Sequence, residues 1–146
     1  MISCTEFIPA YSELFKYIED IDSYDAVKAY WDYISANSTN YVLGDLVREH
    51  GVEGCWLYWS KTLTEEACDC RIEYDEDADV YSLDMRRCPS KGHLLDYPLI
   101  TPYHDYCGHC AALYAPILKK LGLSAEEHYE HVDEARCSSR YWIEKK

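Results

Sequence analysis

The segment CDCRIEYDEDADVYSLDM, residues 68–85, decides the fold class of this chain. In its first seven residues Cys, Cys, Ile and Tyr alternate with Asp, Arg and Glu, and residues 80–85 resume an alternating pattern. A period of two is typical of a half-buried β-strand. The acidic residues 75–79 lie between the two runs and predict a turn. The segment is therefore interpreted as an antiparallel hairpin.

Helical periodicity precedes the hairpin. Apolar residues recur at intervals of three and four in segments 11–21, 24–37 and 41–50, and an aromatic-rich segment predicts a fourth helix within 52–67. Asp22 or Ser23 can cap the second helix, and the polar residues 37–40 are predicted to end it as a loop.

After the hairpin, Pro89 is predicted to end the second strand. A helix is expected from about 105 to 121, then a short helix at 124–133 that begins with a capping-box spacing, then a last strand at 135–143. We therefore predict a single α+β domain over residues 1–146, with N-terminal helices packed on a small antiparallel sheet and a cysteine-bearing helix beside it.

The composition excludes some classes of function. With 27 acidic and 14 basic residues the net charge is −13, which argues against binding to nucleic acid or to an anionic membrane surface. Neither a signal peptide nor a membrane-spanning run is recognisable, so we expect a cytoplasmic protein. Its eight cysteines are then expected to be thiols, metal ligands or nucleophiles. The 15 tyrosines predict a cavity lining or a subunit interface, and hence a homodimer or a small-molecule partner.

Residues 104–110, HDYCGHC, concentrate the reactive side chains. Cys107 and Cys110 share one side if the segment is helical, and the helix N-terminus is expected to lower the pKa of Cys107. Three functions fit this pattern: a redox dithiol, a metal half-site, or a nucleophile with a helper.

The redox interpretation rests on Cys107-Gly108-His109-Cys110, which is identical to the active-site tetrapeptide of protein disulfide isomerases. A thioredoxin fold requires a βαβ unit before the motif. Here a mainly helical segment and a hairpin precede it, so the architecture disagrees with that family.

The metal interpretation needs four ligands for a tetrahedral zinc ion. Cys107 and Cys110 supply half of the site, and Cys88 and Cys137 are the preferred second pair. The pair Cys68 and Cys70, or His93 or His104, are alternatives, although two cysteines on one strand face are also ordinary core residues.

The order of elements, together with Trp56, Arg87-Cys88-Pro89, the helix cysteine and Ala135-Arg136-Cys137, resembles the L-2-amino-thiazoline-4-carboxylic acid hydrolase family and the related vinyl-reductase-type ligand-binding domains over roughly residues 40–143. The resemblance implies a cytoplasmic α+β domain with a cysteine-lined pocket, used by family members for ring-opening hydrolysis of a cyclic sulfur-nitrogen substrate. The doubled cysteine motif and the short loops depart from the family pattern.

A hydrolytic mechanism assigns roles to these residues. Cys107 would attack an electrophilic carbon, His104 or His109 would carry the proton, and Asp105 would orient the imidazole. Arg86 or Arg87, beside Cys88, would hold a substrate carboxylate, with Arg87 preferred and a salt bridge to the acidic turn as the alternative role of either. Trp56 and Tyr106 are the other candidate substrate-binding residues. The rival functions are a zinc-binding or ligand-binding module without turnover and a thiol redox protein using Cys107 and Cys110.

Overall fold

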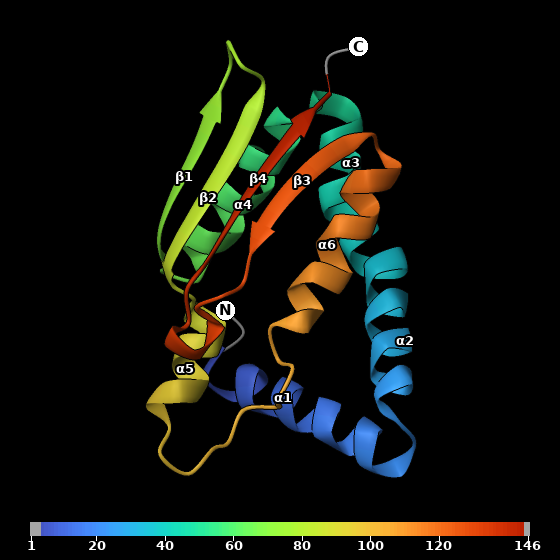
Figure 1. Ribbon diagram of the computed structural model, residues 1–146, viewed down its shortest axis with the longest axis vertical. Helices are drawn as coiled ribbons and strands as arrows, with labels where there is room; N and C mark the ends of the chain where they lie inside the picture. Colours follow the sequence, from blue (N-terminus) through green and yellow to red (C-terminus); the bar gives the residue numbers. More distant parts are fainter. Residues whose placement is uncertain (1–3, 145–146) are drawn as a thin grey trace.

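The computed structural model describes residues 4–144 and confirms the α+β class (Figure 1). The helices are α1 (Cys4–Ile21), α2 (Tyr24–Ile34), α3 (Asn40–His50), α4 (Glu53–Glu65), α5 (Pro89–Asp96) and α6 (Gly108–Lys120). The strands are β1 (Asp69–Asp75), β2 (Val80–Arg87), β3 (Leu123–His128) and β4 (Cys137–Ile143). No helix within residues 4–144 is long and apolar enough to cross a membrane.

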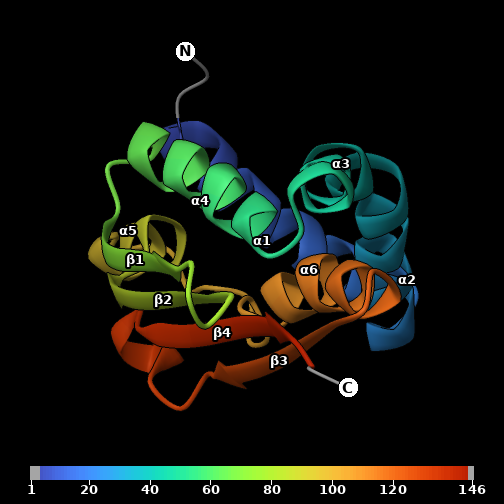
Figure 2. The ribbon, with the colours of Figure 1, turned by 90° about the horizontal axis from the view of Figure 1, so that it is seen from above.

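The predicted hairpin is present as β1 and β2, and the predicted last strand is present as β4. All pairings are antiparallel, in the order β1-β2-β4-β3. Helices α3, α4 and α6 lie over one face of the sheet (Figure 2). On that face the paired residues form rows across the strands, of which Tyr81 with Tyr141 and Met85 with Cys137 are two.

The helix predicted at 124–133 is wrong, because residues 123–128 form strand β3 and pair with β4. A capping-box spacing is a weak local signal, and the ladder with β4 supplies more hydrogen bonds than one isolated turn of helix. The strand also turns Glu127 inward, where its carboxylate accepts a hydrogen bond from the Tyr141 hydroxyl at 2.6 Å.

The loop predicted at 37–40 is also wrong. Ser23 does cap α2, accepting a hydrogen bond from the Ala26 amide. The chain then stays helical through a π-helical segment, Ser35–Thr39, which leads directly into α3. The buried Ser35 hydroxyl donates to the Leu113 carbonyl of α6 at 2.9 Å. This contact anchors the irregular turn, so polar residues that resemble a loop remain inside a helix.

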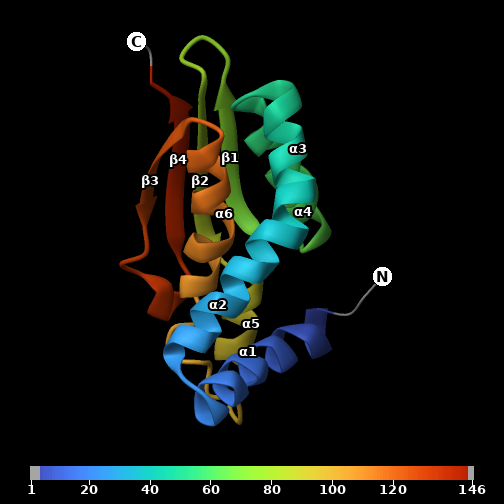
Figure 3. The same ribbon diagram turned by 90° about the vertical axis from the view of Figure 1, so that its right-hand side faces the viewer.

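Two hydrophobic cores hold the domain together. The larger lies between the sheet and helices α3, α4 and α6, and includes Trp59, whose ring is stacked on the neighbouring rings of Tyr81 and Tyr141. The smaller includes Phe15 and Trp31 and lies around α1, α2, α5 and the chain before α6. Helices α1 and α5 lie at one end of the molecule, beyond the end of the sheet (Figure 3). The functional site lies where the two cores meet.

Candidate functional site

A cavity of about 660 Å³ lies between the two cores. Its wall is formed by α1, α4, α6 and the inner face of β2 and β4, together with the start of α5 and residues Tyr106 and Tyr129. Most of the lining is aromatic or aliphatic. Hydroxyl, thiol, imidazole and carboxyl groups are set into this apolar wall, as in small-molecule sites.

Three of the four cysteines predicted as one set line this cavity: Cys88, Cys110 and Cys137. The amide of Cys88 donates to the Ala135 carbonyl at 2.7 Å, and this bond joins the end of β2 to the chain entering β4. Cys88 and Cys137 therefore lie at the same end of the sheet. Cys110 reaches the cavity from the first turn of α6. The sequence prediction of a thiol-rich wall is supported by this placement.

Cys107 lies outside the cavity lining. It is the residue before α6 and packs against the smaller core. Burial, followed by the neighbouring Cys110, raises the pKa of the Cys107 thiol to about 12. The predicted lowering of this pKa by the helix N-terminus is therefore wrong, because desolvation of a thiolate outweighs the helix dipole.

The cavity thiols also resist ionisation. Burial is the main cause for each: it raises the pKa of Cys88 to about 11, and that of Cys110 and Cys137 to about 12. The carboxylates of Glu127 and Glu66 add to the effect at Cys110. At neutral pH these side chains are thiols and need a base before they can act as nucleophiles.

His109 is placed to be that base. Its Nδ1 donates to the Tyr106 carbonyl, which can only accept, so the tautomer leaves a lone pair on Nε2. Nε2 lies 3.6 Å from the Sγ atom of Cys110. The ring packs against Tyr11 and Phe15 of α1, and burial lowers its pKa, which keeps the imidazole neutral.

The other predicted catalytic residues are directed elsewhere. The imidazole of His104 is exposed and pairs with Glu19 of α1 at 2.8 Å. The carboxylate of Asp105 accepts a hydrogen bond from the Tyr24 hydroxyl at 2.6 Å. A Cβ atom at Gly108 would collide with that carboxylate, so close packing against Asp105 favours glycine at this position of the tetrapeptide. The predicted roles of His104 as proton carrier and Asp105 as orienting residue do not agree with this arrangement.

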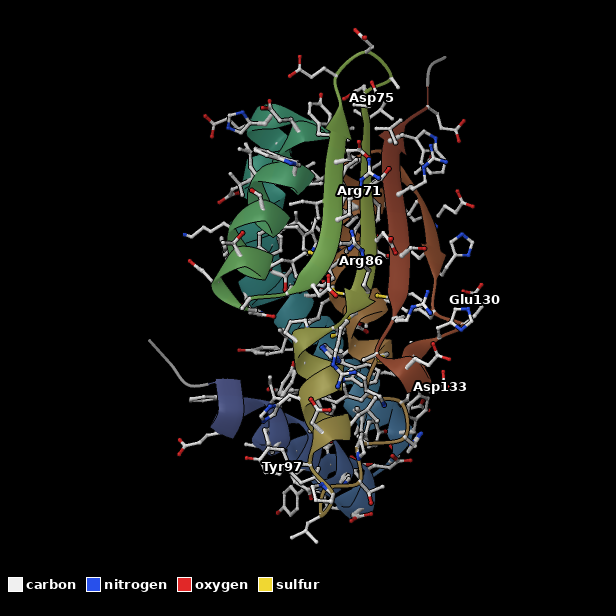
Figure 4. The ribbon with its side chains drawn as sticks, turned by 90° about the vertical axis from the view of Figure 1, so that its left-hand side faces the viewer. Arg71, Asp75, Arg86, Tyr97, Glu130 and Asp133 are labelled. Carbon is white, nitrogen blue, oxygen red and sulfur yellow. The ribbon has the colours of Figure 1, made fainter. Side chains whose placement is uncertain are left out.

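Of the predicted substrate-binding residues, Tyr106 lines the cavity, whereas Arg87 and Trp56 do not. The Tyr106 hydroxyl is hydrogen-bonded to that of Ser90 at 2.5 Å. Arg87 instead forms a salt bridge with Asp96 of α5 at 2.6 Å. Trp56 lies outside the lining and is exposed, whereas Trp59 lines the cavity. Arg86 lies on the solvent side of β2, 3.8 Å from Asp69 (Figure 4).

The cysteines do not assemble a metal centre. Among the described side chains, those of residues 6–144, no group of three or more His, Cys, Asp or Glu is placed to hold a metal ion. Of the set Cys88, Cys107, Cys110 and Cys137, Cys107 does not line the cavity and packs against the smaller core instead. A tetrahedral zinc site does not fit these positions as they stand.

Sequence reasoning missed the contribution of α4. Tyr58, Thr62 and Glu66 all line the cavity, at intervals of four residues along one side of that helix. The same spacing is visible in the sequence, but a polar residue at the end of a helix is ordinarily solvated. Tyr11 of α1 and Glu127 of β3 were also missed, because only the tertiary fold brings them to α6.

Comparisons with known proteins do not assign this chain to a family. No protein-family model matches this chain, and no curated protein matches it significantly. The functional interpretation therefore rests on the geometry of the site.

Proposed function

We propose that this protein binds a small, largely apolar molecule in the cavity between its two cores. The observation that carries the proposal is the cavity itself. Its volume of about 660 Å³ is of the size that holds small ligands. A domain of this size packs its interior densely, so an apolar volume walled by both cores requires a reason.

A pair of matched variants tests this function. Thr62 lines the cavity and Thr64 does not, yet each hydroxyl donates to a carbonyl four residues earlier in α4. We expect the larger side chain of Thr62→Phe to occupy part of the cavity and to weaken binding of the neutral fluorescent dye Nile red. Thr64→Phe loses the equivalent hydrogen bond and should bind the dye as the wild type does. Equal dye binding by both variants, or none by the wild type, would contradict the proposal.

A second function is supported by the His109–Cys110 contact. It is the hydrolysis of a small cyclic C–N/C–S substrate by a cysteine nucleophile, as the resemblance to thiazoline-carboxylate hydrolases implies. Cys110 then replaces Cys107 as the nucleophile, because Cys110 lines the cavity and its Sγ lies next to Nε2 of His109. Sγ would add to the carbon of the ring C=N bond, and the π electron pair of that bond would move to nitrogen, while Nε2 of His109 takes the thiol proton. The nitrogen pair would then re-form the C=N bond as the ring C–S bond breaks, and His109 would pass its proton to the departing sulfur. Water would finally attack the same carbon and release it from Sγ, which regains a proton.

The two cysteines of the tetrapeptide test this second function. With 2-amino-2-thiazoline and its 4-carboxylate as substrates, Cys110→Ala should abolish ring opening, and Cys107→Ala should retain it within about twofold. Loss of turnover in Cys107→Ala but not in Cys110→Ala would identify Cys107 as the nucleophile, as first predicted. A wild-type protein that binds Nile red but opens neither ring is a binding module without turnover.

The free thiols support a reducing compartment. Every described cysteine from Cys55 to Cys137 is a free thiol, which fits the cytoplasm expected from the sequence. The predicted homodimer is supported by exposed Tyr33, Tyr41 and Val42 at the junction of α2 and α3. Sedimentation equilibrium tests it by returning either the chain mass of 17.1 kDa or twice that value.

A further inference from the structure

We infer that the cavity selects a small organic cation, an ammonium group on an apolar body, over neutral and anionic ligands of the same shape. The inference deepens the proposed binding function and rests on it. Two features of the wall carry it: the charges that line the cavity, and an aromatic cluster next to them.

The charged side chains of the wall have one sign. Among the described residues that line the cavity there is no Lys or Arg, whereas Glu66 lies at its rim. Glu127 does not line the cavity and accepts a hydrogen bond from Tyr141; after burial, its carboxylate is the next cause of the raised pKa of Cys110 and of Tyr129. The interior is thus at a negative potential, and the chain as a whole carries a charge of −13. Such a field attracts cations and repels carboxylates.

Three aromatic rings form a cluster in the same wall. Tyr58 and Trp59 of α4 have ring centroids 5.3 Å apart at 84°, and Tyr114 of α6 lies 6.1 Å from Tyr58 and 5.3 Å from Trp59. At these distances the rings are in edge-to-face contact with one another. All three line the cavity, so a ligand there meets them as one aromatic surface. Aromatic rings attract organic cations through the cation–π interaction.

The carboxylate and the aromatic cluster line the same cavity. Glu66 follows Tyr58 by eight residues along one side of α4, with Thr62 between them, and all three line the cavity. Burial is the main reason that the pKa values of Tyr58 and Tyr114 are raised, and the charge of Glu66 adds to both. A cation in the cavity gains from the aromatic surface and from the carboxylate together. A carboxylate ligand would gain from neither, and no Lys or Arg among the described lining residues would compensate its charge.

Three probes of closely similar shape test the selectivity. They are benzyltrimethylammonium, its neutral isostere neopentylbenzene, and the tetrahedral anion phenylmethanesulfonate, each titrated calorimetrically at about pH 8, where carboxylates are ionised. We expect the cation to bind about tenfold more tightly than the isostere, and the anion to bind most weakly. Equal affinity for cation and isostere, or tighter binding of the anion, would overturn the inference.

Matched variants assign the effect to the wall. Glu66→Gln should weaken binding of the cation about fivefold and leave the neutral probe unchanged, since only the charge is removed. Glu65→Gln removes a neighbouring charge outside the lining and should change neither. Tyr58→Leu keeps an apolar wall but removes one ring face, and should lower the preference for the cation. If Nile red binds and benzyltrimethylammonium does not, the inference is wrong while the binding function stands; if neither binds, both fail.

Discussion

Residues His109 and Cys110, adjacent in the chain, hold Nε2 and Sγ 3.6 Å apart at the wall of the cavity. The Tyr106 carbonyl fixes the imidazole tautomer that makes this contact productive. The pair is neutral at rest, because burial raises the pKa of the thiol and lowers that of the imidazole. It resembles a hydroxyl–imidazole pair, which ionises during attack, more than a preformed thiolate–imidazolium pair.

The raised thiol pKa values predict slow alkylation at neutral pH. The rate of iodoacetamide labelling at Cys107 and Cys110 should increase about tenfold per pH unit between about pH 7 and 9, because the thiolate is the reacting species. Peptide-resolved mass spectrometry measures each site separately. A rate at Cys107 that is independent of pH in this range would show the low thiol pKa expected from its place before a helix.

The buried imidazole predicts a loss of stability in acid. The pKa of His109 is lowered in the folded state, so as pH falls below about 6.5 the unfolded chain gains a proton that the folded chain does not. The free energy of unfolding should therefore decrease from about pH 7 to pH 5.5. Urea unfolding of His109→Gln at the two pH values should show a smaller decrease. The same decrease in both proteins would contradict a neutral, buried His109.

A surface histidine tests the assignment of β3 as a strand. Glu126 and Glu130 lie two residues on either side of His128, at 3.1 and 3.2 Å from its ring nitrogens, and they raise its pKa above the usual 6.5. In a helix, residues two apart face different directions, so the two contacts require an extended chain. The stabilisation is complete below the unfolded pKa and is lost as pH rises through the folded value.

Nuclear magnetic resonance titration of the His128 ring checks this assignment. We expect a pKa above 6.5 in the wild type and a lower value in the Glu126→Gln, Glu130→Gln double variant. An unchanged pKa in the double variant would show that the strand geometry is wrong at this position.

Two glycines predict opposite responses to alanine. A Cβ at Gly54 of α4 would lie 2.5 Å from the Leu46 carbonyl oxygen of α3, which is backbone and cannot move cheaply. Gly54→Ala should lower the free energy of unfolding by about 1–3 kcal/mol. At Gly44 the new atom would meet only the flexible side chains of Asn40 and Arg48, so Gly44→Ala should be neutral or stabilising by up to about 1 kcal/mol. Chemical denaturation measures both, and a destabilised Gly44→Ala with an unaffected Gly54→Ala would contradict the packing of α3 on α4.

The divided cysteine set predicts weak zinc binding by the folded protein. Because Cys107 packs against the smaller core and does not line the cavity, the protein should not remove zinc from a chromophoric chelator of about micromolar affinity. Protein purified without chelators that carries one zinc per chain and four protected thiols would instead favour the metal interpretation of the sequence and show that these cysteines rearrange around the metal.

Local sequence signals predicted the elements whose own residues suffice to form them. The alternation in residues 68–85 specifies the hairpin, and the periodicity at 11–21 and 24–37 specifies helices with one apolar side, which the structure has as α1 and α2. The same logic failed at β3 and at the π-helical segment Ser35–Thr39. In both segments, contacts with residues far away in the sequence outweigh the local preference. These contacts are the pairing of β3 with β4 and the hydrogen bond from Ser35 to the Leu113 carbonyl.

The sequence by itself determined the fold class and the supply of thiols near one helix start, because both depend on residue type and short-range period. Only the tertiary structure decided which of those groups share a site. Cys107 and Cys110 differ by one helical turn, yet one packs into the smaller core and the other faces the cavity. The same holds for Trp59 of α4, which stacks on Tyr81 and Tyr141 of the sheet. Burial and the direction of a side chain depend on packing between segments far apart in the chain, and no short-range pattern contains that information.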